Sequence, residues 1–471
     1  MNLLIRSTLG RRSCSLLRLP GFRSFSAAAE SNPEEYARRN YAENATEYNA
    51  VISSLTSQRR TYLLKHAYDD MVLDGVQPTR DTFFSLILGT TKGGFLQESF
   101  FFRDEMKAMG LVPDVEVYNF LISNCGRAKL ANQAVNVLEE MKINGVKPNA
   151  QTYICLLNAC AAAGQLDRVY AIVRDMTAAG AGLNKFCYAG LISAHINKKP
   201  VSDDAATKIV ELVEQSKGWS SVESSPYPPN NLMTAISDEE LFNLPTAPYV
   251  TRRGFLNRQL TVYHVAFHAC AEIGNVKVLE TLSEVLNKDG MVPDLFILLQ
   301  TMRCYLHAGD LDRGLKIFDD YMESGKAPFV ELYVALAEGA MIGYTPRGMQ
   351  IAQDTLVKMT TRNFFLSAKM ATDLLLVAAK TKIDGYTAAN YIWDLAQTKR
   401  LNLAFPAVEA YYNGLKEFEI PEDDPRLLQV TRLYKSQRFR PGAGGAWTGP
   451  GRQQPEGQRK LNNNPTQPQA V

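Results

Sequence analysis

The sequence predicts an all-α fold, a solenoid of stacked helix pairs, because one helix-pair pattern recurs at a fixed interval. Residues 114–149 show the pattern: apolar side chains at helical spacing predict a helix from 115 and a second helix over about 130–142. Gly126 is expected to mark the turn between them. Asn144 and Gly145 are typical of a helix end, and Pro148 prevents continuation.

The landmarks of this pattern return every 35 residues in several successive units. They are Pro78, Pro113 and Pro148; Gly75, Gly110, Gly145 and Gly180; Met71, Met106, Met141 and Met176; and the aromatic residues Tyr48, Phe83, Tyr118, Tyr153 and Tyr188. A single helix pair cannot bury its apolar faces, whereas stacked pairs share a continuous core. The repeat therefore predicts one elongated helical array.

The array is expected to occupy two blocks. Residues 26–44 are a polar lead-in, residues 45–217 form the first block, and residues 258–435 form the second, in which the late units are degenerate. Between the blocks, residues 218–257 break the period and are rich in proline, which predicts an irregular insertion. The aromatic landmark moves from Tyr188 to Tyr263, a step of 75 residues that equals one repeat plus 40 inserted residues.

The late units are less regular. Helices are expected near 347–361, 367–380, 387–399, 407–417 and 425–434. Residues 436–471 consist mainly of Gly, Pro, Gln and Asn with scattered arginines, a composition that predicts a disordered basic tail.

The first 25 residues have the composition of an organellar transit peptide. They contain five arginines and several serines but no acidic residue. Arg23 precedes Phe25 and Ser26 in a pattern typical of mitochondrial processing, so cleavage is expected between Phe25 and Ser26. A basic disordered tail is the alternative interpretation.

The charge is divided unevenly along the chain. The whole sequence has 51 basic and 49 acidic residues, but the five N-terminal arginines and a net +5 from residue 435 onward leave residues 26–434 at −8. An acidic body is a poor match for a long RNA phosphate chain. Any RNA contact is therefore expected to be local or made by the tail. The candidate tail residues are Arg438, Arg440, Arg452, Arg459 and Lys460.

No metal site and no membrane span are predicted. None of the seven cysteines forms a Cys-x-x-Cys pair, and no apolar run approaches the roughly 20 residues that a membrane helix needs. Cys125, Cys160 and Cys270 each follow a landmark tyrosine by seven residues, as expected for buried core thiols. His264 and His268 have the spacing of two metal ligands, but no third ligand is apparent, which favours two histidines packed in the repeats.

The 35-residue unit, with Tyr in its first helix, Glu-Glu-Met-Lys in its second and Gly-Val-Lys-Pro-Asn at the junction, resembles the pentatricopeptide repeat family. The resemblance implies a right-handed superhelix of antiparallel helix pairs, a P-type array without an appended catalytic domain, and a mitochondrial or plastid location. It also implies that two side chains per unit can read one RNA base. The base-selecting pair is the residue after the aromatic landmark and the last residue of the unit.

These reading positions are mostly unsuited to bases. Asn119 with Asn149 matches a combination that the family associates with a pyrimidine, and Asn49 with Thr79 matches in part. The other pairs depart from the code: Phe84 with Asp114, Ile154 with Asn184, Ala189 with Trp219, His264 with Asp294, and Leu299 with Phe329. Apolar side chains cannot hydrogen-bond a base edge, so one readable unit cannot specify a transcript. Asn119 and Asn149 are alternatively polar surface residues retained from the repeat.

The degenerate array resembles the pentatricopeptide repeat proteins of plant mitochondrial ribosomes. The leading hypothesis is therefore a non-catalytic scaffold of the mitochondrial small ribosomal subunit, with ribosomal RNA and ribosomal proteins as partners. The alternative is an organellar factor that binds single-stranded RNA for transcript processing, stability or translation. The deaminase signature His-x-Glu with Pro-Cys-x-x-Cys is absent from the sequence. No enzyme activity, cofactor, small-molecule substrate or membrane is expected, and the mitochondrial matrix is favoured over the plastid.

Overall fold

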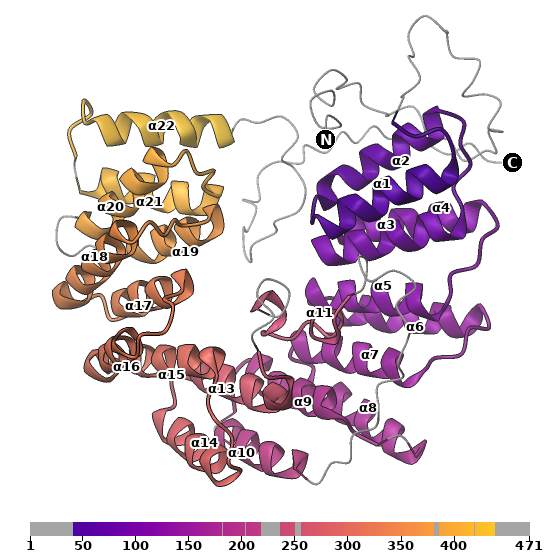
Figure 1. Cartoon of the computed structure of the whole chain (residues 1–471), viewed down its shortest axis with the longest axis horizontal. Coiled ribbons are helices and arrows are strands. Elements are labelled where there is room, and N and C mark those ends of the chain that lie inside the picture. Colours follow the sequence, from indigo (N-terminus) through magenta and orange to yellow (C-terminus); the bar gives the residue numbers. More distant parts are fainter. Residues whose placement is uncertain are drawn as a thin grey trace, which may run out of the picture. The chain divides into compact units, whose positions relative to one another are not determined.

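The computed structural model describes residues 41–180, 182–202, 204–217, 236–249, 256–380, 386–418 and 420–438. Within these ranges every regular element is a helix and none is a strand, which confirms the predicted all-α class (Figure 1). The chain divides into two compact units, with the boundary between Phe365 and Leu366. Each unit is described by itself.

The first unit consists of helix pairs that follow one another along the chain. The pairs are α1 (Ala45–Ser57) with α2 (Leu64–Leu73), α3 (Arg80–Gly93) with α4 (Leu96–Ala108), α5 (Val115–Arg127) with α6 (Ala131–Ile143), α7 (Ala150–Ala162) with α8 (Leu166–Ala178), α9 (Lys185–Asn197) with α10 (Ala205–Ser216), α13 (Thr261–Ile273) with α14 (Val276–Lys288), α15 (Leu295–His307) with α16 (Leu311–Glu323), and α17 (Val330–Ile342) with α18 (Pro346–Thr361). The short helix η2 (Thr61–Leu63) precedes α2, η3 (Arg258–Leu260) precedes α13, and α11 (Asp238–Leu241) lies between α10 and α13.

Helix α5 shows how the sequence sets the ends of a unit's first helix. The Asp114 carboxylate accepts a hydrogen bond from the Val117 amide at 2.9 Å and so caps the free amides of the first turn. The helix continues through Gly126, and the turn is made instead by Lys129, whose φ is 59°. The predicted turn at Gly126 is therefore wrong. Gly126 is required for close packing, because a Cβ there would lie 2.9 Å from the Cα of Ala159 on α7.

The landmark tyrosine ties the first helix of a unit to the end of its second helix. The Tyr118 hydroxyl accepts a hydrogen bond from the Asn144 side chain at 2.7 Å, and the ring is fully buried. In two other units the hydroxyl donates to a carboxylate at the equivalent position, Tyr48 to Asp74 and Tyr263 to Asp289. In these three units the tyrosine thus has a structural role: its ring is buried in the core and its hydroxyl is hydrogen-bonded to the end of the second helix.

The first helices of successive units pack on one another in chain order from α1 to α17. The series includes α9 against α13, although the insertion separates them in sequence (Figure 1). The insertion therefore leaves the stack continuous, as expected if it adds residues between two repeats without replacing one. One hydrophobic core runs through these helices from Ile52 to Cys304.

The second unit contains the last described helices. They are α19 (Ala368–Ala378), α20 (Thr387–Thr398), α21 (Phe405–Glu417) and α22 (Pro425–Arg438). Trp393 of α20 stacks on Tyr411 of α21, with 5.1 Å between ring centroids. These helices confirm the four expected in this region, except that α22 continues to Arg438, four residues beyond the predicted end.

Two further expectations concern buried thiols and membranes. Cys125, Cys160 and Cys270 are buried in the core, as predicted from their position in the repeat. Among the described residues, no helix is both long and apolar enough to span a membrane.

Candidate nucleic-acid interface

Asn119, the central candidate for base reading, is enclosed by its own fold. Its side chain lies on α5 and is 0% exposed. Its Oδ1 accepts a hydrogen bond from the Thr152 hydroxyl at 2.7 Å, and its Nδ2 donates to the Gln151 side chain at 3.3 Å. Asn119 therefore bridges α5 to α7, the first helix of the next unit.

Asn149 belongs to the same polar bridge. It is the cap of α7: its Oδ1 accepts hydrogen bonds from the Thr152 amide at 2.8 Å and the Thr152 hydroxyl at 2.9 Å. Thr152 thus connects the two members of the candidate reading pair. Unlike Asn119, Asn149 is exposed.

Asn49 repeats this arrangement two units earlier. Its Oδ1 accepts a hydrogen bond from the Thr82 hydroxyl at 2.6 Å, and its Nδ2 lies 3.4 Å from the Thr79 hydroxyl. Thr79 caps α3 through the Thr82 amide. In both units, an Asn on one first helix, a cap residue and a Thr on the next first helix form one hydrogen-bonded network.

The reading positions that depart from the code are also buried or packed. Ile154, Ala189, His264 and Leu299 are 6%, 0%, 2% and 3% exposed, respectively. Phe84 packs edge-on against Phe120 of α5, with 5.5 Å between centroids. These side chains serve the contact between successive units.

His264 and Asp294, the last residue of its unit, form an ionisable version of the bridge. The Nε2 of His264 lies 2.7 Å from a carboxylate oxygen of Asp294, the cap of α15. Burial acts to raise the pKa of Asp294, but the hydrogen bond and charge of His264 together with two backbone amides hold it below its ordinary value. His268 lies instead 3.4 Å from the Gln300 side chain. No group of three or more metal-ligating side chains occurs in the described ranges.

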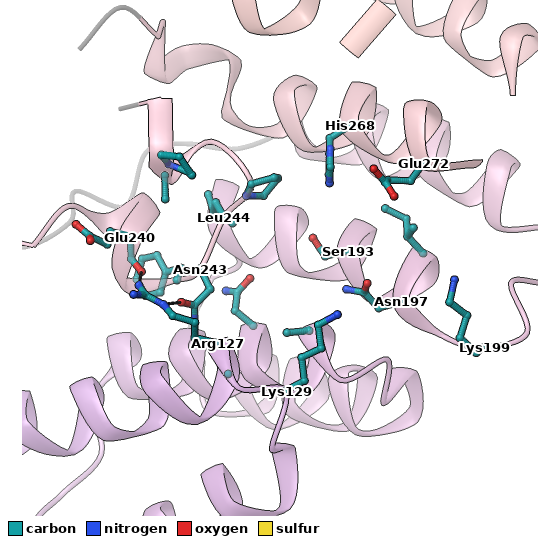
Figure 2. A pocket seen from close by; sticks show the side chains of 18 of the residues that line it. Arg127, Lys129, Ser193, Asn197, Lys199, Glu240, Asn243, Leu244, His268 and Glu272 are labelled. Carbon is teal, nitrogen blue, oxygen red and sulfur yellow. Dashed lines mark hydrogen bonds between the residues drawn. The ribbon is translucent and has the colours of Figure 1, made fainter. Parts of the chain in front are cut away.

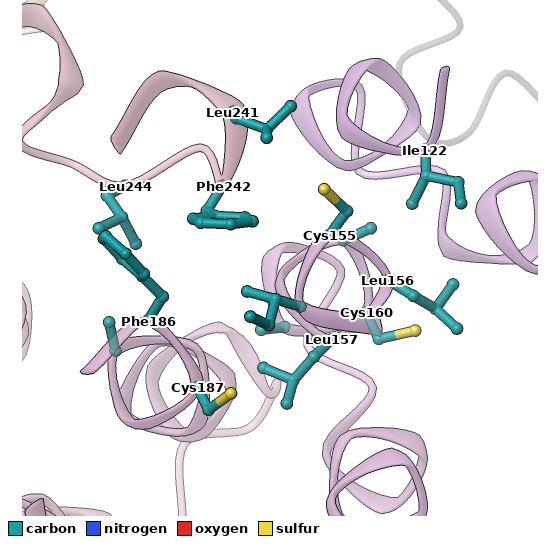
Figure 3. Packing of buried hydrophobic residues seen from close by; sticks show 14 of the residues in the cluster. Ile122, Cys155, Leu156, Leu157, Cys160, Phe186, Cys187, Leu241, Phe242 and Leu244 are labelled. Atoms are coloured by element: carbon teal, nitrogen blue, oxygen red, sulfur yellow. The ribbon is translucent and has the colours of Figure 1, made fainter. Parts of the chain in front are cut away.

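Part of the insertion folds back onto the first helices. We call residues 236–249 the docked segment. Its side chains Leu241, Phe242 and Leu244 are 2%, 3% and 4% exposed, and Phe242 packs on Phe186 of α9 at 4.8 Å between centroids. Figure 3 shows Phe242 and Leu244 facing Phe186, and Leu241 above Cys155 of α7. The proline-rich insertion was expected to be irregular, yet this part of it contains the helical turn α11 and a small apolar core.

Hydrogen bonds hold the docked segment on α5. The Ser123 hydroxyl donates to the Leu241 carbonyl at 2.5 Å, and the side-chain Nδ2 of Asn243 donates to the Ser123 carbonyl at 2.8 Å. Ser123 lies one helical turn after Asn119 and therefore on the same face of α5. The docked segment thus covers the wall beside the candidate reading position.

Three basic side chains surround one buried carboxylate of this segment. Glu240 is 6% exposed in its side chain and lies 3.4 Å from the Arg59 guanidinium. Lys92 and Arg127, 35 residues apart and hence equivalent in successive units, interact electrostatically with the same carboxylate, and Arg127 also donates to the Glu240 backbone carbonyl at 3.4 Å. Burial lowers the pKa of both side chains, and the Glu240 charge opposes that shift. Arg127 also donates to the carbonyl of Thr91 at 2.7 Å.

The docked segment forms one side of a groove of about 920 Å³. Figure 2 shows Arg127, Asn243 and Glu240 on one side of this groove and His268, Glu272 and Lys199 on the other. Its basic lining residues are Arg59, Lys92, Arg127, Lys129 and Lys199, and its acidic ones are Glu240 and Glu272. The groove is therefore net basic although residues 26–434 are net acidic.

The remaining candidate residues lie at the two ends of the chain. Arg438 is the last residue of α22 and is exposed. Its NH1 donates to the Tyr434 hydroxyl at 3.1 Å. Arg440, Arg452, Arg459, Lys460 and the expected cleavage residues Phe25 and Ser26 lie outside the described residues.

Sequence reasoning missed Ser123, Arg127 and the docked segment. One signal for the segment was present: Ser237 followed by Asp238, Glu239 and Glu240 is a helix start with an acidic first turn. Ser237 does cap α11, accepting from the Glu240 amide at 3.2 Å. Where this turn would dock was not encoded in any local pattern.

Comparison with known proteins identifies the repeat. A family model described as the PPR repeat family matches residues 113–162, and a PPR repeat model matches residues 151–180. A mitochondrial pentatricopeptide repeat-containing protein of Arabidopsis thaliana is 57% identical over 442 residues, which cover 94% of this chain and 99% of that protein. The chain belongs to the pentatricopeptide repeat family.

Solved structures of the pentatricopeptide repeat protein PPR10 are similar at low identity. PPR10 in complex with an 18-nt psaJ RNA element is 18% identical with a TM-score of 0.38, and the match covers 85% of this chain and 55% of PPR10. The nuclear proteinaceous RNase P 2 of Arabidopsis thaliana is 15% identical with a TM-score of 0.30, over 37% of this chain and 42% of that protein. This chain therefore matches only about half the length of these solved proteins.

Proposed function

We propose that this pentatricopeptide repeat protein is a non-catalytic, RNA-binding scaffold of the mitochondrial matrix and a structural component of the small ribosomal subunit. Its partners are ribosomal RNA and mitochondrial ribosomal proteins. The mitochondrial location is supported by the arginine-rich N-terminus and by the name of the Arabidopsis relative.

One observation carries the proposal: the side chains placed to select bases are engaged in contacts between repeats. Asn119 would have to give up its bond from Thr152 to pair with a base, and Ile154, Ala189 and Leu299 offer no polar atom. A wall of this kind recognises RNA by charge and shape, through phosphates, rather than by sequence. That mode suits a protein seated on folded RNA and neighbouring proteins.

The alternative is an organellar RNA-binding factor for transcript processing, stability or translation. The basic lining of the groove favours this alternative, since Lys129 and Lys199 are exposed there. The two functions differ in the partner that remains bound when salt screens weak electrostatic contacts: the small ribosomal subunit for the scaffold, and a transcript or no partner for the RNA-binding factor.

Sedimentation of mitochondrial lysate in a high-salt gradient separates them. The scaffold proposal predicts that the epitope-tagged full-length protein migrates with the small ribosomal subunit. Migration as a free protein, or recovery of a single transcript after crosslinking, would instead establish the alternative.

The basic tail supplies a second test. Deleting residues 438–471 removes five basic residues and one acidic residue, a net charge of +4, from an acidic protein and is expected to weaken subunit association. An unchanged sedimentation profile of the truncated protein would exclude a contact made by the tail.

A further inference from the structure

Three aromatic rings form a continuous stack between α21 and α22. Tyr434 of α22 lies between Tyr412 and Phe405 of α21. Its centroid is 4.5 Å from that of Tyr412, with 12° between the ring planes, and 5.6 Å from that of Phe405, with 20° between the planes. All three side chains are partly exposed. The rings are in the offset-stacked arrangement that aromatic pairs favour, on a surface that solvent reaches.

Basic side chains lie over this stack. The Lys416 ammonium is 4.8 Å from the Tyr412 centroid, and the Arg438 guanidinium is 5.7 Å from that of Tyr434. Both side chains are exposed. Glu409 lies on the same side of α21, four residues after Phe405, so the surface is predominantly but not uniformly basic.

Helix α22 is held at its first half and is basic throughout. The Arg426 guanidinium forms two hydrogen bonds with the Asp394 carboxylate of α20, at 3.0 and 2.7 Å. The Asp424 side chain caps the helix through the Arg426 amide at 2.8 Å. Between Pro425 and Arg438 the helix has four basic residues and no acidic one, and only Leu427 and Val430 are buried. Its second half therefore presents charge to solvent from a fixed position.

We propose that Phe405, Tyr412 and Tyr434, with Lys416 and Arg438, form a binding site for single-stranded RNA that is separate from the repeat wall. Bases extend the ring stack at Phe405 and at Tyr412, where the Lys416 ammonium moves from the ring face to the adjoining phosphate, and Arg438 contacts a second phosphate. Base stacking on aromatic side chains is tolerant of sequence because every base presents a π face, and a cation beside the ring matches the phosphate. The site deepens the proposed function, on whose RNA partner it rests.

RNA is favoured over other anionic partners by the pairing of rings with cations. An acidic peptide would use the cations but not the stack. An anionic membrane surface would call for apolar side chains that project from the helix. On α22 the only strongly exposed large hydrophobic residue is Leu428. Duplex RNA keeps its bases paired and cannot extend a ring stack.

The charge test uses the full-length protein and a fluorescein-labelled 20-nucleotide poly(U), measured by anisotropy across a salt series. Removing two phosphate contacts in Lys416→Glu/Arg438→Glu is expected to lower the slope of log K against log[salt] by about 1.4, since each contact on a single strand contributes about 0.7. The matched control is Arg432→Glu, which changes an exposed arginine of the same helix on the side away from Tyr434. Its slope should fall by less than half as much.

The ring test separates stacking from charge. Tyr412→Leu keeps an apolar side chain and all charges but removes the π face, and is expected to weaken poly(U) binding roughly tenfold. Phe405→Leu provides a second ring variant if Tyr412→Leu fails to fold, as judged by circular dichroism. Zero-length photocrosslinking of wild-type protein to poly(U) should map to peptides containing Tyr412 or Tyr434.

Three results would each overturn the site. They are ring variants that bind poly(U) as tightly as wild type, an Arg432→Glu variant that weakens binding as much as the double variant, and equal affinity for duplex RNA. These outcomes are independent of the ribosomal proposal. If the wild-type protein migrates free in the gradient and the variants lose poly(U) binding, the ribosomal role is refuted and the site is supported. If the variants bind poly(U) normally and the wild-type protein sediments with the subunit, the site is refuted and the ribosomal role is supported.

Discussion

Replacing Phe242 with alanine tests whether the docked segment is an independent structural element. Phe242 is 3% exposed and contacts Phe186. Truncating a buried phenylalanine costs about 3–5 kcal/mol. The segment is anchored by three buried apolar side chains, a few hydrogen bonds and ion pairs of Glu239 and Glu240, so a loss of this size exceeds what the remaining contacts restore. Phe242→Ala is therefore expected to release the segment while the helix stack stays folded.

Hydrogen–deuterium exchange read by mass spectrometry resolves this outcome. A loss of 3 kcal/mol in the opening free energy speeds exchange by about two orders of magnitude, since each 1.4 kcal/mol is a factor of ten. Amides of residues 238–244 should lose protection, whereas those of α7 should keep it. Tyr62→Ala is the control, because it truncates an aromatic side chain that is 64% exposed and should leave exchange in both regions unchanged.

Two results would refute this reasoning. Unchanged protection of residues 238–244 would mean that Phe242 does not anchor the segment. Simultaneous loss of protection in α7 would mean that the segment is an integral part of the repeat core and not a docked element.

Three further predictions concern single side chains. Thr152→Val keeps the side-chain shape but leaves the Asn119 Oδ1 without its 2.7 Å donor, and should lower the free energy of unfolding by about 1–3 kcal/mol in urea denaturation; a neutral effect would show that the bridge is dispensable. The pKa of Asp294 lies below its ordinary value despite burial, because of the hydrogen bond from His264, so its stabilising contribution is present above about pH 4 and lost as pH falls through the folded-state pKa. The difference in unfolding midpoint between wild type and Asp294→Asn should therefore stay constant from pH 6 to about pH 4 and shrink at lower pH, and a difference that does not shrink below pH 4 would contradict this. Burial raises the pKa of Cys160 to about 11, so iodoacetamide at pH 8 should modify this thiol only after denaturation, as peptide mass spectrometry can verify.

The helix pairs could be predicted because their determinants are local and repeated. Each determinant acts within a few residues: the cap at Asp114, the landmark tyrosine, and the glycine and proline at the junction. Their recurrence every 35 residues supports the assignment of each one. Gly126 shows the limit. A glycine near a helix end is typical of a turn, but here it is needed for the approach of α7, a contact between units that no local pattern encodes.

The candidate sites were less predictable because they depend on contacts between distant residues. The docked segment joins Leu241 to Ser123, 118 positions away. The ring stack joins Tyr412 to Tyr434 across two helices. Sequence spacing places Phe405 and Tyr412 two turns apart on one face of α21, but the position of the third ring follows only from how α22 packs.

Base selection and repeat packing compete for the same atoms in this protein. Asn119 is the residue whose identity best fits a base-reading role, yet its amide bridges two successive first helices through Thr152. A base could occupy that amide only by breaking the buried hydrogen bond between Thr152 and Asn119 and moving Asn119 away from Gln151, which costs about 1–3 kcal/mol. That cost is comparable to the roughly 1–3 kcal/mol by which a good contact discriminates between bases. A unit built in this way gains almost no net specificity from reading. The asparagine at position 119 is therefore explained by its contribution to the stability of the stack. RNA contacts are made more effectively by side chains that do not connect successive repeats, such as Lys416 and Arg438 on the exposed surface of α21 and α22.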